Sequence, residues 1–215
     1  MQNKKPILII AVLCLISLGL GYWVGQSKEV PIKDMGNKAA ADKAAADKAA
    51  AEKAAAEKAR VENAVNRGET FLLKMQNANE SFLDPNRNST SNTYAMTSLS
   101  LMALVSNGHK PTDPGKVGMA MTRALDYILR EDSRRGTNEY FGAEGSRMYG
   151  HGITTLCLTQ MMRIGVHPRQ EARLGEVTKK AVNLILTSQK LRKSNASHQG
   201  GWRYMPTSRD SDLSI

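Results

Sequence analysis

Side chains that could carry out chemistry are few in this chain, and they are widely spaced. Three of the four histidines, His109, His167 and His198, fall in loop-like segments and share no regular spacing. The two cysteines, Cys14 in an apolar span and Cys157 between two leucines, form neither a disulfide framework nor a metal-ligand pattern. The sequence therefore predicts no metal site and no cofactor.

His151 is the histidine that stands beside groups suited to ligand binding. It lies between two glycines, which permit close approach, and two residues after Tyr149. Further along the chain, the segment GGWRYMP at 200–206 supplies Trp202 and Tyr204. We take His151, Tyr149, Trp202 and Tyr204 as candidate ligand-binding residues. A hydrogen bond at the start of a helix is the structural alternative for His151.

These residues belong to a repeat of about 57 positions. Arg147–Pro168 aligns with Thr90–Pro111 when it is moved back by 57 residues, and each copy is preceded by another segment that also repeats. These preceding segments, 56 to 57 residues apart, are Ala64–Gln76, Ala120–Asp132 and Lys180–Gln189. A fixed period with two helical segments per unit predicts an array of helical hairpins.

The two segments of each repeat differ in polarity. In the first, apolar residues recur at helical spacing, as at Val61, Val65 and Leu72, which predicts an amphipathic outer helix. The second segments, Tyr94–Val105 and His151–Ile164, are apolar or small nearly all round. That pattern is typical of buried inner helices.

The third repeat is incomplete in this sequence. Its outer helix begins at Pro168, and Asp212–Ile215 aligns with only the first residues of an inner helix. The apolar face of the third outer helix would then be uncovered, which few monomers tolerate. We expect self-association or further C-terminal repeats to cover this face. On this interpretation the sequence is the N-terminal part of a longer protein, or its reading frame is interrupted.

Near the N-terminus, Pro6–Val24 is a run of 19 residues without a charge, preceded by Lys4 and Lys5. At about 1.5 Å per residue it would span a hydrocarbon core of roughly 30 Å. No small-x-small cleavage site follows the run, which argues against a signal peptide. We predict that residues 1–27 are a cytoplasmic N-terminus and a single-pass anchor in the cytoplasmic (inner) membrane, with the repeats outside the cytoplasm.

Residues 28–60 are predicted to be a helical linker. Within them, Lys38–Lys58 repeats KAAAD or KAAAE four times, so alanine dominates and each lysine meets an acid four residues later. A five-residue period advances about 140° around a helix, so the charges wind around it and leave no apolar seam for a coiled coil. The sequence predicts a solvated spacer of about 30 Å.

The formal charge of +10 does not indicate a nucleic-acid partner. Residues 61–215 hold 20 basic and 14 acidic side chains, and the remaining excess is divided between 1–37 and 38–60. The basic residues of the repeats are scattered, without the basic and aromatic interleaving of RNA-binding sheets. A basic, solvated surface is the simpler interpretation.

The first repeat also carries a family signature. Arg67–Gln76 reads Arg-Gly-x-x-Phe-Leu-x-x-x-Gln, which resembles the repeat motif of squalene–hopene and oxidosqualene cyclases. Gln189 followed by Gly200-Gly201-Trp202 resembles it in the third repeat. The resemblance covers residues 61–215 and implies a partial α/α toroid of about two and a half hairpins, as in terpenoid cyclases and protein prenyltransferase β subunits. MYGHGI and GGWRYMP are similar to uncharacterised bacterial members. In the family, the glutamine caps helix ends and stacks on the tryptophan.

The resemblance also implies a candidate acid. Cyclases of this class protonate an alkene with the middle acid of Asp-x-Asp-Asp-Thr, and Asp210–Ser214 resembles that motif, with Asp212 at the donor position and Asp210 two residues before it. Leu213 and Ser214 depart from the motif, and few aromatic residues are present to line a cavity. The alternative role for either aspartate is to cap the next helix.

Two functions are compatible with this sequence. The first is a membrane-anchored, non-catalytic binding or scaffolding module, whose concave inner-helix surface takes a protein, polymer or lipid ligand. The second is a cyclase-like enzyme on isoprenoid substrates, with Asp212 as general acid. The altered acid motif and the scarcity of aromatics favour the first.

Overall fold

The computed structural model describes residues 32–83 and 91–212, with side chains from residue 37 onward. The apolar run 6–24 and the final residues 213–215 lie outside the described residues. Every named element within the described ranges is a helix, which confirms the prediction of an all-α chain. None of these helices is both long enough and apolar enough to cross a membrane.

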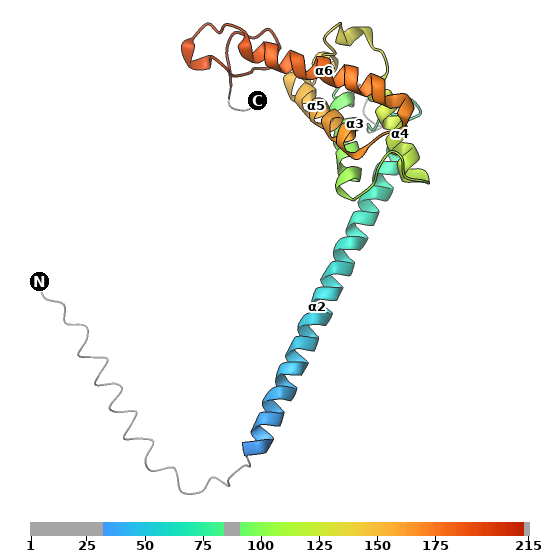
Figure 1. Ribbon diagram of the computed structural model, residues 1–215, viewed down its shortest axis with the longest axis vertical. Coiled ribbons are helices and arrows are strands. Elements are labelled where there is room, and N and C mark those ends of the chain that lie inside the picture. The colour runs from blue at the N-terminus through green and yellow to red at the C-terminus, as the bar shows by residue number, and fades with distance from the viewer. Residues whose placement is uncertain (1–31, 84–90, 213–215) are drawn as a thin grey trace, which may run out of the picture. The chain divides into compact units, whose positions relative to one another are not determined.

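The chain divides into two compact units, residues 1–59 and 60–215. The long helix α2 (Ile32–Lys74) contributes to both (Figure 1). In the first unit every described side chain is exposed, as expected of a helix without an apolar seam. Its charges pair weakly along the surface, with 3.9 Å between Lys48 Nζ and Glu52 Oε1. The predicted linker and the first repeat helix form one continuous helix, because residues 59–67 contain no glycine or proline to interrupt α2.

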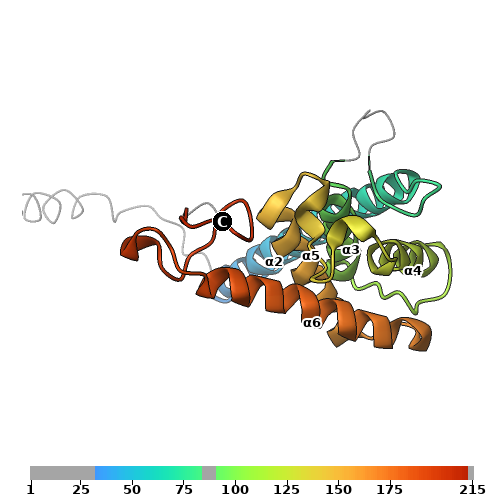
Figure 2. The same cartoon turned by 90° about the horizontal axis from the view of Figure 1, so that it is seen from above.

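The second unit continues with four helices joined by shorter connections. These helices are α3 (Thr93–Ser106), α4 (Lys116–Leu129), α5 (Arg147–Ile164) and α6 (Pro168–Lys190). Short 3₁₀ helices form in the connections and after α6, at η1 (Ser133–Arg135), η2 (Phe141–Glu144) and η3 (Ala196–His198). Figure 2 shows these helices packed together, with α6 running along one side.

Glycines set the boundaries of the inner helices. Gly108 and Gly165 follow α3 and α5 with φ of 91° and 83°, a backbone conformation that favours glycine. We predicted that the second inner helix begins at His151, but α5 begins four residues earlier, at Arg147. The chain doubles back tightly here, since a Cβ atom on Gly142 would lie 2.1 Å from the carbonyl oxygen of Arg147.

The two inner helices, α3 and α5, run parallel. Near their first turns, a Cβ atom on Gly150 would lie 3.5 Å from Ala95 Cβ. Further along both helices, Ser98 Oγ donates to Thr154 Oγ1 over 3.2 Å. A later residue of α3 thus contacts a later residue of α5, so the two helices run in the same direction. The small residues at these positions let the two backbones approach closely.

The outer helices α4 and α6 are also parallel. Gln170 near the start of α6 donates to the Thr122 carbonyl over 3.2 Å, and Arg173 one turn later donates to the Leu129 carbonyl over 3.2 Å. A second glutamine, Gln76, joins the chain after α2 to α4, since its Nε2 donates to the Ala120 carbonyl over 2.9 Å. The outer helices are therefore tied together by side chains that bind backbone carbonyls of the neighbouring helix.

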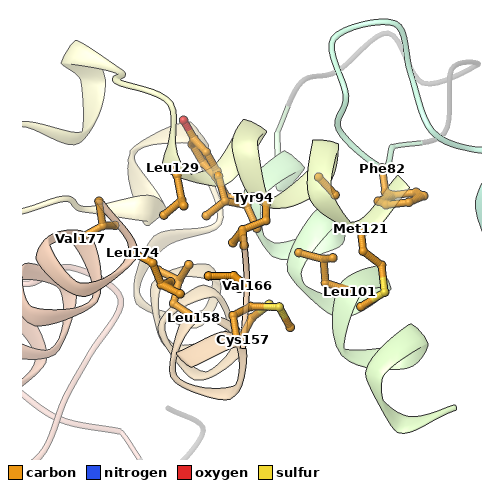
Figure 3. Packing of buried hydrophobic residues seen from close by; sticks show 14 of the residues in the cluster. Phe82, Tyr94, Leu101, Met121, Leu129, Cys157, Leu158, Val166, Leu174 and Val177 are labelled. Atoms are coloured by element: carbon orange, nitrogen blue, oxygen red, sulfur yellow. The ribbon is translucent and has the colours of Figure 1, made fainter. Parts of the chain in front are cut away.

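One hydrophobic core lies between the inner and outer helices (Figure 3). Fully buried side chains come from each of α3, α4, α5 and α6, for example Leu101, Met121, Leu158 and Val177. Leu72 and Leu73 of α2 pack against its edge. Burying each such leucine or methionine stabilises the fold by roughly 1.5–3 kcal/mol. This burial holds the inner helices against the outer ones.

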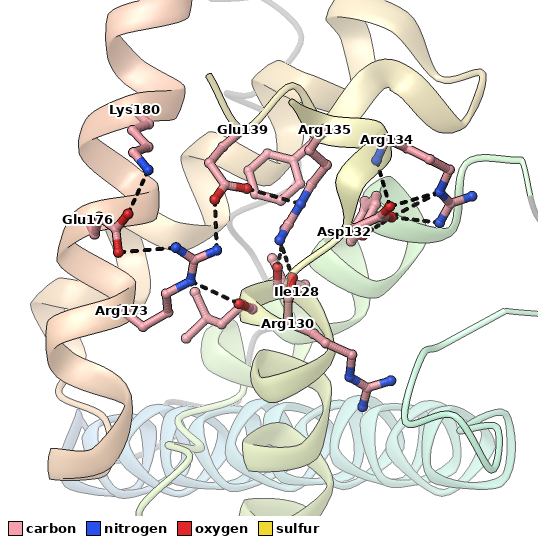
Figure 4. Close-up of polar contacts among 12 residues, drawn as sticks. Ile128, Arg130, Asp132, Arg134, Arg135, Glu139, Arg173, Glu176 and Lys180 are labelled. Carbon is pink, nitrogen blue, oxygen red and sulfur yellow. Dashed lines mark hydrogen bonds and ion pairs between the residues drawn. The ribbon is translucent and has the colours of Figure 1, made fainter. Parts of the chain in front are cut away.

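A buried ionic network holds the connection between α4 and α5 (Figure 4). Glu139 accepts from Arg173 Nη2 at 2.7 Å and lies 3.0 Å from Arg135 Nε. Arg135 is almost fully buried and also donates to the carbonyls of Ile128 and Arg130. Because every charge has a partner, the network can remain inside the protein and attach the connection to α6.

Candidate functional site

The inner helices expose apolar side chains on the side opposite the core, a surface we call the inner face. On α3, Met96 and Leu99 remain 44% and 43% exposed, while Leu101 is fully buried on the core side. On α5, Leu156 is 54% exposed and Leu158 is fully buried. Positions 96, 99 and 103 share one face of α3 by helical spacing. Residues 148–162 contain no lysine, arginine or acidic residue, and α3 has none, so the middle of this surface carries no charged group.

At the C-terminal end of α3 the inner face meets a groove between α2 and α3, about 410 Å³ in volume. The exposed residue Ala103 belongs to both surfaces. The remaining residues of the groove are mainly apolar: Val65, Gly68, Glu69, Phe71, Leu72, Leu104, Ser106 and Asn107. Phe71 is 59% exposed, and the space beside Gly68 is open. The groove is thus a concave, apolar extension of the inner face.

Polar side chains border this groove. Glu69 Oε2 lies 2.8 Å from His109 Nε2 and accepts from Asn107 Nδ2 over 3.0 Å. These bonds connect α2 with the turn that follows α3. They satisfy the carboxylate within the protein, so the groove's binding capacity rests on its apolar walls.

His151 lies in the core, not on the inner face. It is fully buried, its Nδ1 accepts from the Phe141 N–H over 3.3 Å, and its Nε2 lies 3.0 Å from the Ala181 carbonyl oxygen. An acceptor at Nδ1 and a donor at Nε2 define the neutral ring. Burial lowers the pKa of His151 to about 4. His151 therefore joins η2, α5 and α6, because both of its ring nitrogens form hydrogen bonds with the protein backbone.

Two of the other predicted ligand residues, Tyr149 and Tyr204, meet at the start of α5. The ring centres of Tyr149 and Tyr204 are 5.9 Å apart, and the Met148 N–H donates to the Tyr204 carbonyl over 3.0 Å. Trp202 is half-buried nearby in the sequence, with its Nε1 donating to the Ile185 carbonyl of α6 over 3.0 Å. The segment after α6 thus returns to α5, which the repeat pattern alone does not predict.

Both candidate acids belong to the same segment and share one arginine. Arg203 Nε lies 3.6 Å from Asp210 Oδ2, and Arg203 Nη1 lies 3.3 Å from Asp212 Oδ2. The Asp212 N–H donates to the Trp202 carbonyl over 3.0 Å. This geometry ties the segment together.

Two arginines missed by the sequence argument flank Tyr204. The guanidinium carbons of Arg203 and Arg147 lie 4.9 Å and 5.4 Å from the centre of its ring. A signal was present, because Arg203 directly precedes Tyr204 and Arg147 lies two residues before Tyr149. Spacing alone does not show that Tyr149 and Tyr204 meet, so the cluster emerges only from the fold.

No metal site forms among the described residues, where no group of three or more histidine, cysteine or acidic side chains converges. Cys157 is fully buried on α5, and burial raises the pKa of its thiol to about 12. A thiol in that state is a packing group, because the thiolate is the reactive form.

Comparisons with protein-family models, with curated proteins and with solved structures found no match for this chain.

Proposed function

We propose that this protein is a membrane-anchored helical-repeat module of the α/α-toroid kind, which binds an apolar ligand on its inner face outside the cytoplasm and does not catalyse a reaction. The exposed side chains Met96, Leu99 and Leu156 in the middle of two uncharged stretches carry the proposal. Exposed apolar side chains that gather on one surface, without charged residues among them, mark a site where another apolar group binds.

The toroid assignment is supported by the register of the helices. Parallel inner helices inside parallel outer helices are the arrangement that the cyclase-like signature implies. Gln76, the last residue of that signature, joins the chain after α2 to the next outer helix by donating to the Ala120 carbonyl, although this contact lies within α4 and does not cap a helix end. The anchor itself rests on the uncharged run 6–24, and the spacer on the alanine-rich repeat.

A lipid-like chain suits this surface better than an extended peptide. The centre of the inner face presents aliphatic side chains and no charged group. A peptide lying there would leave backbone N–H and C=O groups without partners, at a cost of about 1–3 kcal/mol each. An alkyl chain has no such groups, and the groove at Ala103 would accommodate part of it.

The test is photolabelling of the full-length protein in membranes with a long-chain fatty alcohol that carries a diazirine on its chain. We expect labelled peptides from α3 and α5, and we expect the double variant Leu99→Glu with Leu156→Glu to lose that labelling roughly tenfold, since each buried charge opposes an apolar ligand. Met119→Glu is the matched control, because Met119 is equally exposed but lies on outer helix α4. Absence of label from both inner helices would refute the proposed function.

A further inference from the structure

The starting observation is a pair of guanidinium groups beside one aromatic ring. Arg147 and Arg203 both lie within 5.4 Å of the centre of the Tyr204 ring. Both lie within the distance at which a cation is attracted to the face of an aromatic ring. Arg203 has two carboxylates, from Asp210 and Asp212. Arg147 has no carboxylate partner within the described parts of the chain.

Arg147 differs in this respect from arginines of the neighbouring elements. Arg130, Arg134 and Arg169 each form an ion pair at 2.6 Å, with Glu80, Asp132 and Asp126 in that order. Arg147 is exposed, yet its guanidinium is oriented by the face of Tyr204. Its backbone is fixed as well, since it stands at φ 58° at the tight entry to α5. An arginine oriented in this way can receive an oxyanion with little loss of side-chain entropy.

Arg147 also lies at one end of the inner face. Tyr204 contacts Tyr149, and Tyr149 lies two helical turns before Leu156 on the same side of α5. The groove at Ala103 marks the other end, near the C-terminus of α3. Because α3 and α5 are parallel, these two ends are separated by about 20 Å, the length of a 14-residue helix. A cationic group at one end and an apolar track leading away from it match a charged head and a long alkyl chain.

We propose that the inner face takes an anionic amphiphile, whose carboxylate or phosphate monoester head binds Arg147 beside Tyr204, and whose alkyl chain lies over Met96, Leu99 and Leu156. This inference rests on the proposed apolar binding function and adds the chemical class of the ligand. Tyr149 and Tyr204 form the boundary between the head and the chain.

The experiment compares a diazirine fatty acid with its matched fatty alcohol on the full-length protein in membranes, with labelled residues mapped by mass spectrometry. We expect the acid to label α3 and α5 roughly fivefold more than the alcohol, the ratio expected of one partly exposed ion pair. Arg147→Gln should lower labelling by the acid to that by the alcohol and leave labelling by the alcohol unchanged. Competition by an unlabelled alkyl phosphate and by an unlabelled fatty acid then distinguishes the two head groups.

Arg192→Gln is the matched control, because Arg192 is also exposed but follows α6 and lies on neither inner helix. It should leave the preference for the acid intact. Equal labelling by acid and alcohol, or a preference that survives Arg147→Gln, would overturn the anionic head group while leaving the apolar function in place. Loss of label with both probes would instead overturn the underlying function.

Discussion

Among single residues, His151 has a structural role that its residue type alone does not indicate, because its side chain is buried. Its imidazole is neutral, and burial lowers its folded-state pKa to about 4, whereas an unfolded chain has a histidine pKa near 6.5. As pH falls below about 6.5 the unfolded state binds a proton and the folded state does not. The stability from His151 is therefore fully present above that pH and is lost progressively down to about pH 4.

We predict that the wild-type protein loses about 3 kcal/mol more stability than the His151→Gln variant between pH 7 and pH 4. The difference between the two isolates this residue, because the other histidines titrate in both. Urea unfolding of each protein at several pH values measures it. Parallel pH profiles would show that His151 is not the neutral, buried group described above.

The location of His151 illustrates what sequence could and could not predict at this scale. The two glycines beside it and Tyr149 before it suggested a surface for ligands. Whether a side chain on an uncharged helix points to the core or away from it depends on which neighbours pack there, and α5 has apolar residues on every side. Arg147 was missed for a related reason, since an absent ion pair is a property of the folded neighbourhood.

At the scale of elements, the connection between α4 and α5 depends on one buried carboxylate. Glu139 lies between Arg135 and Arg173, and Arg135 is only 1% exposed. We predict that Glu139→Gln destabilises the protein by about 3–5 kcal/mol, because it leaves a buried guanidinium without its counter-ion. Denaturant unfolding gives the value.

The comparison for this prediction is Glu176→Gln. Glu176 also pairs with Arg173, at 3.1 Å, but its side chain is 48% exposed, so its loss should cost less than about 1 kcal/mol. If the two variants were equally stable, the network would not be what attaches this connection to α6.

Helices were the most predictable elements, and connections the least. The ends of α3 and α5 follow from Gly108 and Gly165, and the long uncharged stretches within them indicate inner helices. In contrast, the linker and the first repeat helix are one helix, because nothing between them breaks it. The return of Tyr204 to α5 depends on hydrogen bonds and ring contacts across more than fifty positions, which local patterns do not encode.

Over the whole molecule, the two units should respond independently to mutation. Ala50 lies within the exposed, alanine-rich part of α2, where no described side chain is buried. We predict that Ala50→Pro removes several residues from the helix, at a local cost of about 3 kcal/mol, and leaves the unfolding of residues 60–215 unchanged.

Circular dichroism measures the helix lost, and the denaturant midpoint of the repeat unit measures the rest. Ala50→Gln is the control, because glutamine is a good helix former and should change neither. A lowered midpoint in the proline variant would mean that the spacer contributes to the stability of the repeats.

The parallel register of α3 with α5 has a consequence for the history of this chain. Ser98 and Thr154 meet at nearly the same separation as the period of the sequence. A gene duplication or deletion that inserts or removes one whole period would recreate the same junction between neighbours. Such a protein can change its length in whole units while its junctions stay constant.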